Sequence, residues 1–192
     1  DEIICRYYKA QCDKLVGRVD ENTVYKIENI MRSVSITTSD RAVVRYSLEK
    51  QEATGQPAAA LQLPDGRIVT GKSSELLGAA SAMLLNALKV LAGIPDDTLL
   101  ISPAVLEPIA NLKTGCFGNK NPRLHMDETL IALAICAAPD EVAARAYREL
   151  PNLRGAEMHS TVVLSHVDDT TTKKPGLRLT CEPVYQNKRS ER

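Results

Sequence analysis

Apolar residues recur at helical spacing through the first quarter of the chain, which predicts three consecutive helices. The first is expected over 1–16 and the second over 20–34, each with apolar side chains three or four positions apart. A third is expected over 39–53, followed by Gly55, because glycine most easily takes the left-handed conformation that ends a helix. Residues 1–55 are therefore predicted to form a helical segment or small subdomain.

After the third helix the pattern changes to the alternation of apolar and polar or small residues that is typical of strands. Strands are predicted over 58–63 and 67–70, joined by a hairpin turn at Asp65-Gly66. A long helix over 74–91 is apolar around much of its circumference, so we expect it to be buried. Further along the chain we expect strands over 98–101, 159–165 and 177–180, helices over 103–112, 127–138 and 139–150, and polar connections over 113–126 and 168–175.

This order of elements predicts the fold class. A hairpin followed by helices and further strands indicates an α/β domain over 56–186, built as a three-layer α-β-α sandwich. Its mixed sheet is expected to have five strands. The charged tail over 187–192 is expected to lie outside this domain.

Charge and composition narrow the classes of partner. The chain has 24 Lys and Arg against 24 Asp and Glu, so it lacks the excess of cations that a dedicated nucleic-acid binder needs. No apolar run approaches the roughly 20 residues that span a bilayer. We therefore expect neither a nucleic acid nor a membrane as partner. The five cysteines are odd in number and form no Cys-x-x-Cys pair, which favours a reducing, cytoplasmic location.

A P-loop pattern, G-x-x-x-x-G-K-S, runs from Gly66 to Ser73. Its spacer holds three consecutive β-branched residues, 68–70, which favour an extended backbone rather than a loop that curls around phosphate. Two interpretations of the following strand-to-helix junction remain open. Either Lys72 and Ser73 bind an anion at the start of the helix, or Ser73 and Ser74 only cap it.

The long connection over 113–128 combines glycines, asparagines, cations, a histidine and two carboxylates, a mixture typical of functional loops. We predict two groups of site residues in it: Lys120, Asn121 and Arg123 as ligands for an anion, and His125 with Asp127 or Glu128 for acid–base chemistry. The alternative is structural. Asp127 would cap the next helix, Glu128 would suit its first turn, and His125 would bond a carbonyl.

No metal site is predicted, because His125, Asp127 and Glu128 do not have the spacing of a zinc-binding helix. His159 and His166 are expected at the two ends of one strand and on its opposite faces, so at most one of them faces any given site.

Several stretches together resemble the C-terminal part of an uncharacterised family of bacterial proteins, a domain of unknown function. They are IICRYYKA, LPDGRIVTGKSSELLGAASAMLLNALK, GNKNPRLHMDETLIALAICAA and LTCEPVYQ, at 3–10, 63–89, 118–138 and 179–186. The resemblance implies that the chain is an excerpt of a longer protein. It also implies that the missing N-terminal part carries a glycine-rich, P-loop-like segment.

The resemblance further implies a cytidine-deaminase-like fold for the C-terminal subdomain. Zinc deaminases place a His or Cys before a Glu at the helix after the hairpin, and a Pro-Cys-x-x-Cys at a later helix. Here the first place reads Ser-Ser-Glu and the second reads Ser102-Pro103-Ala104. The zinc ligands are absent from both places, so we expect no zinc-dependent deamination, and the sequence identifies no cofactor.

Two functional hypotheses follow. In the first, the chain is a structural or co-catalytic domain that works with its own N-terminal part, which handles a nucleotide or phosphate, and it self-associates through its helices. In the second, the junction at 70–74 and the loop at 113–128 converge on an enzyme site for a small phosphorylated or nucleotide ligand.

Overall fold

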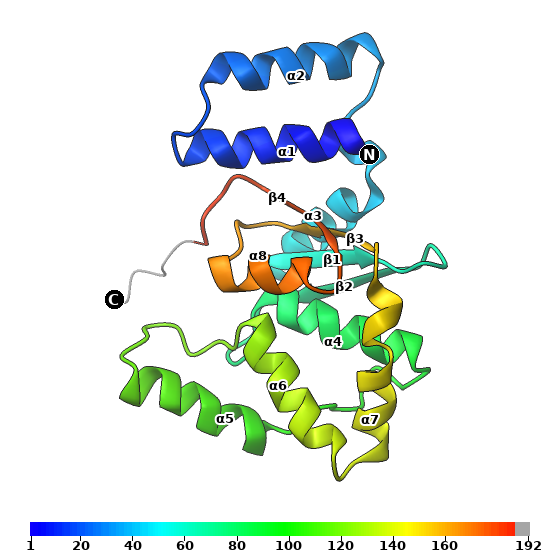
Figure 1. The fold of residues 1–192 in the computed structure, drawn as a ribbon, viewed down its shortest axis with the longest axis vertical. Coiled ribbons are helices and arrows are strands. Elements are labelled where there is room, and N and C mark those ends of the chain that lie inside the picture. The colour runs from blue at the N-terminus through cyan, green and yellow to red at the C-terminus, as the bar shows by residue number, and fades with distance from the viewer. Residues whose placement is uncertain (187–192) are drawn as a thin grey trace.

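A computed structural model describes residues 1–186, in which eight α-helices surround a four-stranded sheet (Figure 1). The strands are β1 (Ala58–Gln62), β2 (Ile68–Lys72), β3 (Glu157–Ser160) and β4 (Arg178–Cys181). The helices are α1 (Glu2–Leu15), α2 (Glu21–Ser33), α3 (Ala42–Thr54), α4 (Ala79–Leu91), α5 (Pro103–Asn111), α6 (Met126–Ala137), α7 (Glu141–Arg148) and α8 (His166–Lys173). No helix among these residues is long and apolar enough to cross a membrane.

The sheet is mixed, as the sequence predicts. Its strand order is β2-β1-β3-β4, with β1 antiparallel to both neighbours and β3 parallel to β4. The β1–β2 hairpin turns at Gly66, whose φ of 87° lies in the left-handed region that glycine tolerates best. The β-branched residues of the P-loop pattern lie in β2, so this segment is extended.

Helices cover both faces of the sheet (Figure 1). α3 packs against β1, β2 and β3, whereas α4 packs against β1 and β2 from the other side. Alternation along β1 explains this arrangement, because Ala59 and Leu61 join the core cluster that contains α4. The buried helix predicted over 74–91 is confirmed in its apolar part, since nine of the thirteen residues of α4 are buried.

One glycine sets the distance between α4 and the sheet. A Cβ added to Gly71 on β2 would lie 2.1 Å from the backbone nitrogen of Met83 and 2.5 Å from its Cα. These atoms belong to the helix backbone and cannot move aside independently. α4 therefore lies directly on β2 because residue 71 has no side chain.

The predicted strand over 98–101 is wrong, so within residues 1–186 the sheet has four strands rather than five. Leu100 and Ile101 are buried, but Leu99 is 69 % exposed and the segment follows turns that begin at Pro95. Its apolar side chains enter the core from an irregular backbone without joining the sheet. A short apolar run in the sequence does not distinguish a buried strand from an irregular segment whose side chains are buried.

Three other predicted boundaries also differ. The backbone of 74–78 bonds to the loop before α6, so α4 begins only at Ala79. The strand over 159–165 ends at Ser160, and the polar segment over 168–175 is largely helix α8. The tail over 187–192 lies outside the described residues.

Candidate anion-binding and acid–base site

A cavity of about 320 Å³ lies where four segments meet. They are the residues after β2, the first turn of α4, the loop before α6, and the residues that follow β3. The polypeptide after β4 closes one side of it with Tyr185 and Gln186. Cavities of this size are at the lower end of those that take a single small ligand.

The two segments in which the sequence predicts an anion site lie side by side along this cavity. The Nε–H of Arg123 donates to the carbonyl of Ser74 at 2.5 Å. The backbone N–H of Leu124 donates to the carbonyl of Leu76 at 2.8 Å, and that of Gly78 donates to the carbonyl of Leu124 at 3.4 Å. These bonds connect the loop before α6 to the junction between β2 and α4.

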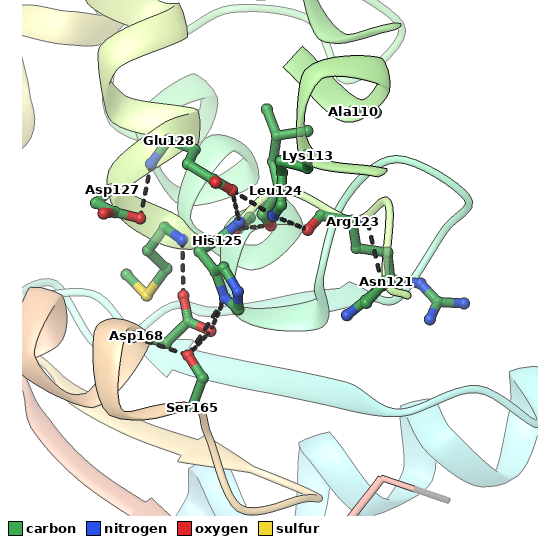
Figure 2. A network of polar contacts seen from close by, with 12 residues as sticks. Ala110, Lys113, Asn121, Arg123, Leu124, His125, Asp127, Glu128, Ser165 and Asp168 are labelled. Atoms are coloured by element: carbon green, nitrogen blue, oxygen red, sulfur yellow. Dashed lines mark hydrogen bonds and ion pairs between the residues drawn. The ribbon is translucent and has the colours of Figure 1, made fainter. Parts of the chain in front are cut away.

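His125 and Asp168 form a hydrogen-bonded pair at the cavity (Figure 2). The Nδ1 of His125 lies 2.9 Å from Oδ2 of Asp168, and the other carboxylate oxygen accepts the backbone N–H of Met126 at 2.7 Å. Ser165, the N-cap of α8, donates its hydroxyl to Oδ2 at 2.9 Å. The carboxylate is thus held by the starts of two helices and presented to one ring nitrogen of His125.

The geometry is that of a dyad and not of a Ser-His-Asp triad. In a triad the serine and the carboxylate occupy opposite nitrogens of the imidazole. Here the Ser165 hydroxyl lies 3.2 Å from Nδ1, the same nitrogen that contacts Asp168. Nε2 of His125 has no partner among residues 1–186 and is the nitrogen left for a ligand.

The pair favours its charged forms. The hydrogen bond that His125 donates to the carboxylate of Asp168 raises the pKa of His125, although partial burial opposes this change. Burial acts to raise the pKa of Asp168, but hydrogen bonds from His125 and from the backbone of Met126 outweigh it and lower the pKa. An imidazolium beside an ionised carboxylate is therefore favoured over a wider pH range than for an isolated histidine.

The two carboxylates that the sequence predicts as partners of His125 are placed elsewhere. Glu128 accepts the backbone N–H of His125 at 2.8 Å and the Nζ–H of Lys113 at 2.6 Å. Lys113 is 2 % exposed and also donates to the carbonyl of Arg123 at 2.6 Å. Asp127 accepts the backbone N–H of Glu128 at 2.8 Å. Both carboxylates thus serve the start of α6, and the ring of His125 contacts Asp168 instead.

The predicted anion ligands divide into two groups. Ser73, Asn121 and Arg123 line the cavity. Ser73 is 4 % exposed, and its hydroxyl has no hydrogen-bond partner within the described part of the chain. Lys72 and Lys120 are exposed on the surface, outside the cavity lining.

The structural alternative is confirmed for Glu128, which lies in the first turn of α6, but the predicted helix caps are wrong. Ser73 and Ser74 do not cap α4, because Gly78 is its N-cap and the hydroxyl of Ser74 accepts the N–H of Leu77. His125, not Asp127, is the N-cap of α6.

The other two histidines lie away from the cavity lining. His159 is fully buried in β3, where its Nδ1 contacts the hydroxyl of Thr180 at 2.8 Å. His166 is the first residue of α8, so the argument from opposite strand faces fails because the strand ends before it. Over residues 1–186 no group of three or more His, Cys, Asp or Glu side chains is placed to hold a metal ion.

Sequence reasoning missed Asp168 and Ser165. Ser165 lies at the end of the strand predicted over 159–165 and Asp168 at the start of the predicted polar connection, yet Ser165-His166-Val167-Asp168 carries a signal. A serine followed three positions later by a carboxylate marks the start of a helix. That signature predicts α8, but the approach of Asp168 to His125 depends on tertiary packing.

Comparison with known proteins identifies the family. The model of the C-terminal part of DUF1846, a domain of unknown function, matches residues 39–190. A UPF0371 protein of Streptococcus thermophilus (strain CNRZ 1066) is 51 % identical over 185 residues, which cover 96 % of this chain and 37 % of the relative. UPF0371 proteins of Streptococcus pyogenes serotype M5 and Corynebacterium glutamicum (strain R) are 50 % and 48 % identical. Each alignment covers 97 % of this chain and 38 % of the relative.

The chain therefore spans less than two fifths of the length of these relatives. The resemblance seen in the sequence to the C-terminal part of an uncharacterised bacterial family is confirmed. The chain belongs to the UPF0371 family and carries its C-terminal DUF1846 domain of unknown function.

Proposed function

We propose that the cavity binds a small molecule through a phosphate group, and that His125 transfers a proton to or from that molecule with Asp168 as its partner. The observation that carries this proposal is the His125–Asp168 pair beside a cavity that Arg123 and Ser73 also line. In this proposal the anion ligands are Arg123 of the loop before α6 and Ser73 of the junction between β2 and α4, and the carboxylate is Asp168 of α8.

The local charges favour an anion. Arg123 supplies a guanidinium, and His125 adds a second positive charge when it is protonated, against the single negative charge of Asp168. The first turn of α4, Gly78–Ser81, lines the same cavity and contributes the positive end of a thirteen-residue helix. The hydroxyl of the nearly buried Ser73, which has no hydrogen-bond partner among residues 1–186, is a further donor for a phosphate oxygen.

The dyad supports proton transfer. Because Asp168 occupies Nδ1, it fixes the ring orientation and the tautomer of His125 and leaves Nε2 to accept or donate a proton. Ser165 is assigned a capping role and not that of a nucleophile, since it contacts the nitrogen that Asp168 already holds.

The domain is proposed to act together with the rest of the full-length protein, of which relatives carry more than three fifths outside the matched region. A nucleotide- or phosphate-handling N-terminal part and self-association of the chain stay predictions from the sequence. The cytidine-deaminase-like arrangement of the sheet also remains a prediction from the sequence. Each agrees with a co-catalytic role for this domain.

Calorimetric titration with inorganic phosphate tests the binding proposal. We expect the 192-residue chain to bind phosphate, Arg123→Ala and Ser73→Ala to weaken binding by at least 10-fold, and Lys120→Ala to leave it unchanged. Lys120 is the matched control because it is a cation of the same loop outside the cavity lining. Equal losses in Arg123→Ala and Lys120→Ala would reduce the effect to general surface charge and refute the site.

The pH dependence of the same titration tests the dyad. Affinity is expected to fall as the pH rises through the folded-state pKa of His125, because the imidazolium loses its charge. His125→Gln should remove this dependence while Arg123 still binds phosphate weakly. Because inorganic phosphate itself loses a proton near neutral pH, the wild-type profile is compared with that of His125→Gln, and identical pH profiles for the two proteins would contradict a role for His125.

A further inference from the structure

We infer that the ligand of this cavity is a nucleoside monophosphate, whose base stacks on Tyr185 while its phosphate lies near Arg123 and Ser73. The inference rests on the proposed phosphate site and names the remainder of the molecule bound there. Tyr185 and Gln186 line the same cavity as the proposed phosphate ligands.

The segment that carries Tyr185 is fixed in place beside the cavity. The backbone N–H of Val163 donates to the carbonyl of Val184 at 2.8 Å, and the N–H of Val184 donates to the carbonyl of Glu182 at 2.8 Å. Val163 also lines the cavity. The residue after Val184 is thus held next to the opening by backbone bonds, and little ordering of this segment is needed when a ligand binds.

Tyr185 offers an uncovered aromatic surface. It is 54 % exposed, and its hydroxyl has no hydrogen-bond partner among residues 1–186. A single exposed aromatic residue on a protein surface needs no explanation. One that lines a cavity together with an arginine is different, because a base can stack on its ring while the phosphate reaches the cation.

Two amide side chains complete the recognition of a base. Asn121 and Gln186 line the cavity, and each carries both donors and an acceptor. The edges of nucleobases present the same mixture of groups, and amide side chains pair well with them. A sugar phosphate without a base would leave the Tyr185 ring unused.

Size and charge favour a mononucleotide over a larger nucleic acid. The cavity has a volume of about 320 Å³, enough for one small ligand. The chain has 24 cationic and 24 anionic side chains, so it lacks the net positive charge that favours binding of a polynucleotide backbone.

The test compares inorganic phosphate, ribose 5-phosphate and the four common nucleoside 5′-monophosphates by calorimetry with the 192-residue chain. At least one nucleotide is expected to bind about 10-fold or more tightly than ribose 5-phosphate, as stacking on one aromatic ring allows. Tyr185→Ala should remove this advantage, and Tyr185→Phe should keep it. Tyr147→Ala is the control, because Tyr147 is a similarly exposed tyrosine on α7 that does not line the cavity.

The outcomes separate this inference from the proposed function. If phosphate and ribose 5-phosphate bind and no nucleotide binds more tightly, the nucleotide inference is overturned and the phosphate site stands. If a nucleotide binds tightly but Tyr185→Ala and Tyr147→Ala behave alike, the stacking assignment is wrong. If none of the phosphates binds, both proposals fail.

Discussion

Replacing Asp168 by alanine is predicted to lower the free energy of unfolding by about 3 to 5 kcal/mol near pH 6. The carboxylate accepts hydrogen bonds from the backbone of Met126, from His125 and from Ser165, and its side chain is only 13 % exposed. A hydrogen bond to a charged group contributes about 1.5 to 3 kcal/mol. Because the three hydrogen bonds share one carboxylate, their energies are not additive, and the expected loss of stability is smaller than the sum of three separate contributions.

Two further variants calibrate this value. Asp168→Asn keeps one oxygen for the Met126 N–H and should lose about half as much as Asp168→Ala. Asp169→Ala is the matched control, since the neighbouring carboxylate forms an ion pair with the exposed Lys173. Such surface pairs contribute about 0.5 kcal/mol. Chemical denaturation followed by far-ultraviolet circular dichroism measures all three, because the chain has no tryptophan to report by fluorescence.

The loss of unfolding free energy in these variants should depend on pH in a defined way. The raised pKa of His125 means that its contribution is complete below the ordinary value of 6.5 and is lost as the pH rises through the folded-state pKa. The lowered pKa of Asp168 means that its contribution is complete above the ordinary value of 3.8 and is lost as the pH falls through the folded-state pKa. The difference between wild type and Asp168→Asn should therefore be largest near pH 5 to 6 and smaller at pH 9. A difference that is constant with pH, or an Asp168→Ala loss no larger than that of Asp169→Ala, would refute the dyad.

Three further predictions concern the surroundings of the site. Gly71→Ala should destabilise the domain by about 3 kcal/mol or more in thermal or chemical denaturation, because its Cβ would meet the backbone of α4. Gly115→Ala is the control: a Cβ at residue 115 would meet no atom within 4 Å, so stability should change by less than about 0.5 kcal/mol. Lys113→Met should cost about 3 kcal/mol in the same assay, because it leaves Glu128 without its buried partner, and a neutral result would show that the ion pair contributes nothing. A fluorophosphonate probe should not label Ser165, because Ser165 contacts the same nitrogen of His125 as Asp168 does. Mass spectrometry of the treated protein measures the labelling, and stoichiometric labelling of Ser165 would show that it acts as the nucleophile of a triad.

The hairpin could be predicted from the sequence because its signals are local. Alternation along 58–63 and 67–70 and the Asp65-Gly66 turn determine both strands and their register. The segment over 98–101 shows where local reasoning fails. Leu100 and Ile101 are buried, as the residues of a strand would be, but the segment pairs with none of the four described strands and its backbone is irregular.

Part of the site could also be predicted from local sequence signals. Composition alone draws attention to Arg123 and His125, because a long connection that combines cations, a histidine and amides is unusual. The partner of His125 could not be found this way, since Asp168 is 43 residues distant and reaches the ring only because α6 and α8 pack together. Glu128 is three residues from His125, yet it bonds the backbone of that residue, as a carboxylate in the first turn of a helix commonly does.

The most direct test of the site is an NMR titration of the His125 imidazole with and without inorganic phosphate. Without phosphate, we predict a pKa above the ordinary value of 6.5. Phosphate should raise it further in the wild type and in Lys120→Ala, because a nearby anion favours the imidazolium, and should leave it unchanged in Arg123→Ala. A His125 titration that is the same with and without phosphate in the wild type would contradict the proposed site.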